Sequence, residues 1–157
     1  MADRGVVALE ECVAKPELAA AHWEFLLQSV ESDDESTLEL ATEALENCGP
    51  VPNQDMSRLM AQLGEASFSH GGPQRQYWLC TLMGRSGAAG SEAQGSVAAI
   101  VAEPRYPMNV RERAAWCLGE LGMLTSESRE RLRGVRRDAS PRLQRLVEAV
   151  LSQSKPA

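Results

Sequence analysis

The chain has 157 residues and a formal net charge of −6, with 43% hydrophobic and 24% charged residues. This length and composition are those of one ordinary globular domain, and they exclude a collagen-like, disulfide-rich or largely disordered chain. Alanine occurs 21 times, whereas Val, Ile and Thr together occur 16 times, so the composition favours helices over strands. The sequence shows no secretory signal and no apolar run long enough to span a membrane. We therefore expect a cytoplasmic protein without a membrane partner.

Apolar spacing, together with Pro and Gly at the ends of the apolar runs, predicts nine helices and no strand. Sequences typical of capping boxes predict helix starts at Ser32, Ser91 and Asn109, because Glu or Gln follows each three residues later. The expected helices, in chain order, are 4–14, 16–30, 34–48, 54–63, 73–86, 91–102, 109–121, 126–137 and 141–153.

The chain repeats itself with offsets of 38 and then 35 residues. Segment 38–49 aligns with 76–87, which aligns with 111–122. The equivalent apolar positions are Ala41, Leu79 and Ala114; Ala44, Leu82 and Cys117; and Leu45, Met83 and Leu118. This spacing predicts a helix that packs in the same way in each copy, followed by a shorter second helix. Since a single pair cannot bury its apolar face, the pairs are expected to stack.

The segment 109–122, Asn-Val-Arg-Glu-Arg-Ala-Ala-Trp-Cys-Leu-Gly-Glu-Leu-Gly, resembles the first helix of a HEAT repeat, particularly the short HEAT-like form of phycobilin lyases. The copies ending at Gly87 and Gly49 lack its Val-Arg pair. The resemblance implies an all-α, right-handed α-α superhelix in which the second helices line a concave surface. We expect about four helix pairs in a single domain over 1–157. The clearest repeats are 34–64, 73–103 and 108–138, and a C-terminal capping helix is expected at 141–153.

The sequence contains no convincing catalytic or metal-binding pattern. His22 and His70 lie 48 residues apart, outside any zinc-site motif. The cysteines, expected as reduced core residues, are Cys12, Cys48, Cys80 and Cys117. The tryptophans, also expected in the core, are Trp23, Trp78 and Trp116. Tyr77 and Trp78 are adjacent, so on a helix the two rings are not expected to share a face. We therefore expect no catalytic residue, no metal and no cofactor, and predict that the protein is not an enzyme.

The charges are separated along the chain. Residues 1–66 contain 14 acidic and 3 basic side chains, whereas residues 105–157 contain 6 acidic and 11 basic ones. In the expected helix 126–137, Ser128, Leu132 and Val135 form the inward face. One adjoining flank carries Arg129, Arg133, Arg136 and Arg137, with Arg131 on the other side. Arginine forks suit carboxylates and phosphates, so this flank is a candidate binding site. The alternative is a solvated face that pairs with Glu127 and Glu130.

These observations predict a non-enzymatic scaffold or adaptor that binds an unknown protein partner on its concave helical face. An acidic segment of that partner would suit the arginine flank. One alternative is nucleic-acid binding through the same arginines, although the strongly acidic first half argues against it. Another is an accessory role like that of phycobilin lyases, which handle a bilin. The opposite charges of the two ends also leave head-to-tail self-association open.

Overall fold

The computed structural model describes residues 9–32, 34–48, 53–64, 72–87, 92–122, 124–137 and 139–153, and all regular elements in these ranges are helices. Residues 9–14 are helical. The further helices are α2 (Pro16–Ala21), α3 (Trp23–Ser29), α4 (Glu35–Asn47), α5 (Asn53–Gly64), α6 (Gly72–Ser86), α7 (Gln94–Ala102), α8 (Met108–Leu121), α9 (Ser126–Arg133), the 3₁₀ turn η2 (Gly134–Arg137) and α10 (Pro141–Gln153). The all-α prediction is confirmed for this part of the chain.

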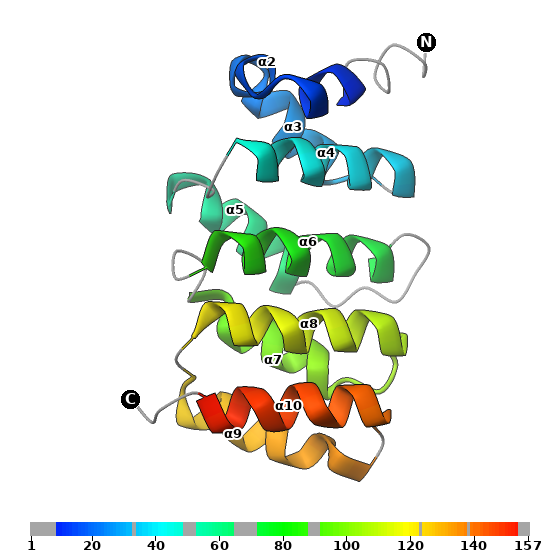
Figure 1. The fold of residues 1–157 in the computed structure, drawn as a ribbon, viewed down its shortest axis with the longest axis vertical. Helices are drawn as coiled ribbons and strands as arrows, with labels where there is room; N and C mark the ends of the chain where they lie inside the picture. The colour runs from blue at the N-terminus through cyan, green and yellow to red at the C-terminus, as the bar shows by residue number, and fades with distance from the viewer. Residues whose placement is uncertain are drawn as a thin grey trace.

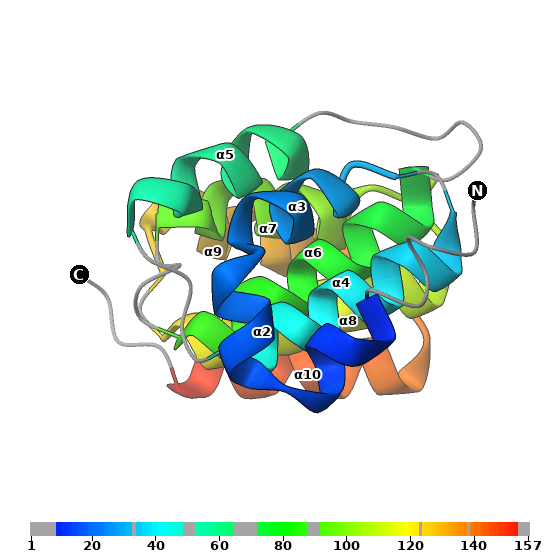
Figure 2. The ribbon, with the colours of Figure 1, turned by 90° about the horizontal axis from the view of Figure 1, so that it is seen from above.

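The helices form two rows along the long axis of the molecule (Figure 1). We call α4, α6, α8 and α10 the first-helix row; they lie side by side, each against the next. The second-helix row consists of α3, α5, α7 and α9 and lies on the other side of the core, as the view along the stack shows (Figure 2). The expected pairs therefore correspond to α4 with α5, α6 with α7 and α8 with α9. Helix α10 has the predicted bounds and ends the first-helix row.

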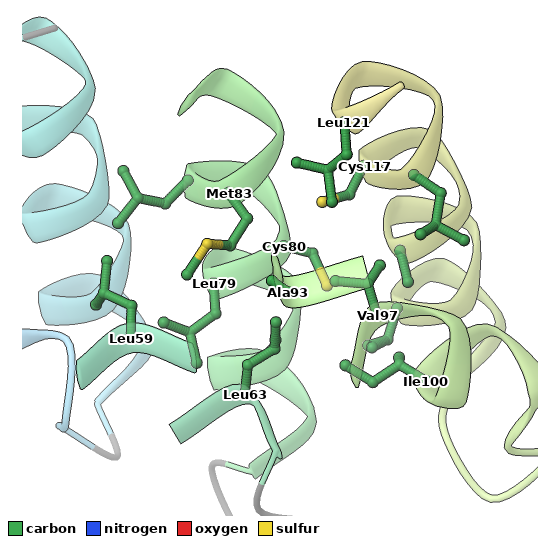
Figure 3. Packing of buried hydrophobic residues seen from close by; sticks show 14 of the residues in the cluster. Leu59, Leu63, Leu79, Cys80, Met83, Ala93, Val97, Ile100, Cys117 and Leu121 are labelled. Carbon is green, nitrogen blue, oxygen red and sulfur yellow. The ribbon is translucent and has the colours of Figure 1, made fainter. Parts of the chain in front are cut away.

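The core lies between the two rows and follows the internal repeat. All nine equivalent positions identified from the offsets are at most 1% exposed. Side chains from the second-helix row meet them: Leu59 and Leu63 of α5 and Val97 and Ile100 of α7 interleave with residues of α6 and α8 (Figure 3). Burying large aliphatic side chains of this kind contributes about 1.5–3 kcal/mol each before entropy is counted. The prediction that the first helices pack in the same way in each copy is confirmed.

Buried polar residues at one repeat position join two of the helix pairs to the pair before them. Arg111 on α8 is 3% exposed, and its Nε donates to the carbonyl oxygen of Val101 in the last turn of α7 at 2.8 Å. Gln76 holds the equivalent position on α6 and is 1% exposed. Its Nε2 donates to the carbonyl oxygen of Gln62 in the last turn of α5 at 3.3 Å. Both contacts satisfy a carbonyl oxygen at a helix end, where no intrahelical donor is available.

Two helix predictions are wrong in part. The expected helix 16–30 is broken at His22, whose backbone leaves the helical region with φ −115° and ψ 31°. No Pro or Gly marks this bend in the sequence. The bend lets both α2 and α3 pack on α4. The expected helix 126–137 ends at Arg133 and continues as the 3₁₀ turn from Gly134, a residue with weak helix preference.

The starts of two helices also differ from the predicted caps. Asp34 rather than Ser32 caps α4, because the Asp34 carboxylate accepts from the Thr37 backbone N–H at 2.9 Å. Asn109 lies inside α8, which begins at Met108 after Pro107. Ser91, the third predicted cap, and residues 4–8 of the first expected helix lie outside the described residues.

Candidate partner-binding surfaces

The arginine flank predicted on 126–137 is only partly a helical stripe. The inward face is confirmed, since Ser128, Leu132 and Val135 are all below 5% exposed. Arg129 is half-buried, whereas Arg133 is exposed. The Nη1 of Arg133 donates to Glu130 Oε2 at 2.8 Å, as the solvated-face alternative expects.

Arg136 and Arg137 do not continue that flank. Both residues belong to the 3₁₀ turn η2, in which successive residues turn through about 120° instead of 100°. The predicted helical register therefore does not apply to them, and their side chains lie outside the described part of the structure. Within the described side chains, the candidate flank consists of Arg129 and Arg133.

A cavity of about 440 Å³ lies between the N-terminal ends of α7 and α9, on the second-helix row. Its walls include Gly95 and polar side chains, some of them negatively and one of them positively charged. Gln94 bridges the two helices, because its Oε1 accepts from the Thr125 backbone N–H at 2.7 Å. Arg131 Nη2 lies 3.5 Å from Glu127 Oε1, and both side chains line the cavity. The lining side chains offer hydrogen-bond donors and acceptors to a ligand.

Sequence reasoning missed this cavity. It placed Arg131 away from the candidate flank and gave Gln94 only a role in capping a helix start. Gln94 and Thr125 are 31 residues apart, and only the stacking of α7 on α9 brings them together. The capping sequence at Thr125 was a usable local signal for the start of α9, since its hydroxyl accepts from the Ser128 N–H at 3.2 Å.

A second candidate surface lies on the exposed face of the first-helix row, where α6 and α8 meet. Arg113 Nη2 donates to the Tyr77 hydroxyl at 2.7 Å, and the guanidinium lies 4.9 Å from the ring centroids of both Tyr77 and Trp116. Arg85 lies 5.5 Å from the Trp116 ring, and its Nε is 4.0 Å from Glu46 Oε2 on α4. We call Glu46, Tyr77, Arg85, Arg113 and Trp116 the arginine–aromatic cluster. Cation–π contacts join α6 to α8 in this cluster, and the contact between Glu46 and Arg85 adds α4.

The electrostatics of this cluster are set by partial burial. Removal from water raises the pKa of Glu46, and the positive charges of Arg85 and Arg113 only partly offset that effect. The contact at 4.0 Å between Glu46 and Arg85 is therefore a weak ion pair, and Arg85 keeps 62% of its side chain exposed. The cluster presents two guanidinium groups held against aromatic rings.

The two adjacent aromatic residues of α6 do share a surface, which corrects the prediction from helical geometry. Tyr77 and Trp78 touch edge to face, with centroids 5.0 Å apart and planes at 84°. Both rings line a cavity of about 250 Å³ together with Glu35, Gln74 and Asn109. Side chains of this length bend towards each other although their Cα positions differ by 100°. Trp23 and Trp116 pack partly buried against the core, as expected.

The remaining chemistry-bearing residues are dispersed. Cys12, Cys80 and Cys117 are buried as expected, whereas Cys48 is only half-buried. Burial raises the pKa of Cys80 to about 12 and the pKa of Cys117 well above its usual value. His22 is exposed at the bend between α2 and α3, and His70 lies outside the described residues. In the part of the chain that the structure describes, no group of three or more His, Cys, Asp or Glu side chains is arranged to hold a metal ion. Nor does any described helix have the length and apolar character needed to cross a membrane.

Comparison of the chain with family models, with curated proteins and with solved structures finds no match. Function must therefore be argued from the surfaces of this molecule, because a stack of helices by itself implies no activity. Two surfaces carry the arguments below: the cavity between α7 and α9 on the second-helix row, and the exposed face of the first-helix row.

Proposed function

We propose that the protein is a non-enzymatic scaffold, built as a right-handed HEAT-like solenoid, that binds a segment of a protein partner on its second-helix row. The repeated burial pattern and the ties from Gln76 and Arg111 to the preceding pair support the solenoid. Repeat stacks of this kind offer extended surfaces on which a partner segment binds across several repeats.

The observation that carries the proposal is the polar cavity between α7 and α9. Its volume of about 440 Å³ accommodates a few side chains of an extended peptide. Gln94 and Glu127 offer the oxygen acceptors that peptide N–H groups need, and Arg131 offers donors for a carbonyl or carboxylate. Glu127 keeps 80% of its side chain exposed, so an acidic residue of the partner can replace it beside Arg131 at little cost. An acidic segment is therefore the expected ligand.

The test uses two variants that change the cavity differently. A Cβ at Gly95 meets no atom within 4 Å, and Gly95 lines the cavity, so Gly95→Leu is chosen to fill it. Arg131→Glu reverses the charge that receives the acidic segment. Arg105→Glu is the matched control, because Arg105 is an exposed arginine outside the cavity, in the connection between α7 and α8. Circular dichroism checks that all three proteins are folded.

Each protein is used as bait in native extracts with and without nuclease treatment, and bound proteins are quantified by mass spectrometry. We expect a partner that the wild type and Arg105→Glu both retain and that both cavity variants lose by more than about tenfold, because one variant blocks the cavity and the other places like charges in contact. Equal recovery with all four baits contradicts the proposal, as does the absence of a specific partner with the wild type. Binding that disappears only after nuclease treatment favours nucleic acid instead.

A further inference from the structure

The exposed face of the first-helix row carries an ordered distribution of charge. Helix α4, at one side, presents the exposed carboxylates of Glu39 and Glu43, which lie seven and three residues before Glu46 on the same helix face. Helix α10, at the other side, presents the exposed guanidinium groups of Arg142 and Arg145. Between them, α6 and α8 present the arginine–aromatic cluster. The face therefore runs from acidic through aromatic to basic.

The internal repeat fixes the level of these groups along the helices. Arg85 on α6 and Glu120 on α8 occupy equivalent positions under the 35-residue offset, so they lie at the same height in the row. Arg142 Nε is 3.7 Å from Glu112 Oε2, and a Cβ at Gly119 would lie 3.6 Å from Val150. These contacts set α10 level with α8. Arg145 therefore lies near the middle of α10, at the height that Glu39 and Glu43 hold on α4.

The charges on this face are complementary to those on the same face of a second copy. A two-fold axis parallel to the helices and passing between α6 and α8 lays α4 of one copy over α10 of a second copy, and α6 over α8. Glu39 and Glu43 then face Arg145, and Arg85 faces Glu120. Each of these contacts occurs twice, as an isologous interface requires. The opposed pairs join unlike charges, and the aromatic rings of Tyr77 and Trp116 lie at the centre.

The size of the face suits a stable dimer. Helices α4, α6, α8 and α10 have 13 to 15 residues. Such helices are about 20 Å long, and neighbours pack about 8–10 Å apart. The face therefore measures roughly 20 Å by 35 Å, near the 800 Å² per partner of a standard interface. Arg, Trp and Tyr, which form its centre, are the residues enriched at interface hot spots.

We propose that two copies of this chain associate through their first-helix rows as a two-fold homodimer. The charge order along the row selects the orientation in which α4 of each copy meets α10 of the other. The second-helix rows then lie on opposite outer surfaces of the dimer. This inference goes beyond the scaffold function, because it uses the other row of helices and leaves the cavity between α7 and α9 of each copy accessible to partners.

The test reverses the charges at either end of the face. Light scattering and sedimentation velocity at low salt then measure whether the protein is a monomer or a dimer. One variant carries Glu39→Arg and Glu43→Arg; the other carries Arg142→Glu and Arg145→Glu. Arg145→Glu alone is a milder form that keeps the contact between Arg142 and Glu112. The wild type is expected at twice the monomer mass of 17.1 kDa. Each double variant places like charges opposite each other, so its dimerisation is expected to weaken more than about tenfold.

Recombining the charges makes the test specific to this interface. An equimolar mixture of the two double variants restores both sets of unlike pairs and is expected to dimerise. A single chain with all four substitutions is expected to dimerise as well. Arg131→Glu, on the second-helix row, is the control that keeps the dimer. A monomeric wild type at millimolar concentration overturns the proposal. So does a wild-type dimer that neither double variant weakens, a mixture that stays monomeric, or growth into larger head-to-tail species.

Discussion

Trp116 of α8 lies directly against Gly84 of α6. A Cβ at Gly84 would fall 2.4 Å from Trp116 Cζ3, closer than non-bonded carbon atoms approach. Gly84 thus allows the Trp116 ring to cross onto α6, where Arg85 and Arg113 lie against it. The arginine–aromatic cluster depends on the missing side chain of one glycine.

Gly84→Ala is expected to destabilise the protein by about 1–3 kcal/mol, because the added methyl group displaces the Trp116 ring. Urea denaturation measures the change, and Trp fluorescence reports the displacement. Gly119→Ala is the control on α8, since its Cβ would lie 3.6 Å from Val150 in ordinary contact. That variant is expected to be more stable than the wild type by up to about 1 kcal/mol. Equal effects of the two substitutions would contradict the crowding at Gly84.

Glu46→Gln is expected to stabilise the protein above neutral pH. Burial raises the pKa of Glu46, so its carboxyl group binds a proton more tightly in the folded protein than in the unfolded chain. The contribution of Glu46 to stability therefore falls as pH rises through the interval between the unfolded and folded pKa values. Glu46→Gln removes this pH dependence of the unfolding free energy. The unfolding free energies of both proteins, measured between pH 4 and pH 8, show the difference. Glu17→Gln, on the exposed surface of α2, serves as the control. A pH profile unchanged by Glu46→Gln would refute the assignment.

Cys48 is expected to react before Cys80 and Cys117. Cys48 is half-buried and is alkylated first, although burial raises its pKa too. Cys80, with a pKa of about 12, and Cys117 react only when the core opens, because the thiolate is the reactive form. Iodoacetamide labelling at pH 8, followed by intact mass measurement, gives the order. Cys48→Ser removes the fast step. Rapid labelling of Cys80 in native protein would show that the interface between α6 and α8 opens readily.

Arg111→Met is expected to cost about 1–3 kcal/mol, because the buried carbonyl oxygen of Val101 loses the donor at 2.8 Å. Methionine keeps the apolar stem, so the change removes the guanidinium group and retains the packing around the stem. Arg105→Met, at an exposed arginine in the preceding turn, is expected to stay within about 0.5 kcal/mol of the wild type. Thermal and urea denaturation compare the two. An Arg111→Met protein as stable as the control would mean that this tie is not needed.

The sequence predicts the first helices well because their signal is local. Ala41, Leu79 and Ala114 occupy one repeat position on three different helices. All three are buried, because each first helix turns the same face towards the core. The bounds of α10 follow from Pro141 and one apolar stripe. The bend at His22 was not predictable, because it arises where α2 and α3 both reach α4, and no local residue marks it.

The candidate sites were harder to predict because they combine distant residues. Gln94 meets Thr125 only after α7 and α9 stack, and Trp116 reaches Gly84 only after α8 lies on α6. The arginine flank was predicted from ideal helical geometry, which holds for Arg129 and Arg133 and ends at Gly134. A reading of single helices therefore finds which faces are buried, but not which side chains meet between helices.

The buried hydrogen bonds of Arg111 and Gln76 both have acceptors that lie earlier in the chain. Each joins a first helix to the end of the second helix made just before it. As the chain leaves the ribosome, α6 and α8 each find the acceptor of this hydrogen bond already synthesised, and neither contact waits for residues still to be added. The stack can therefore assemble vectorially, pair by pair, during translation.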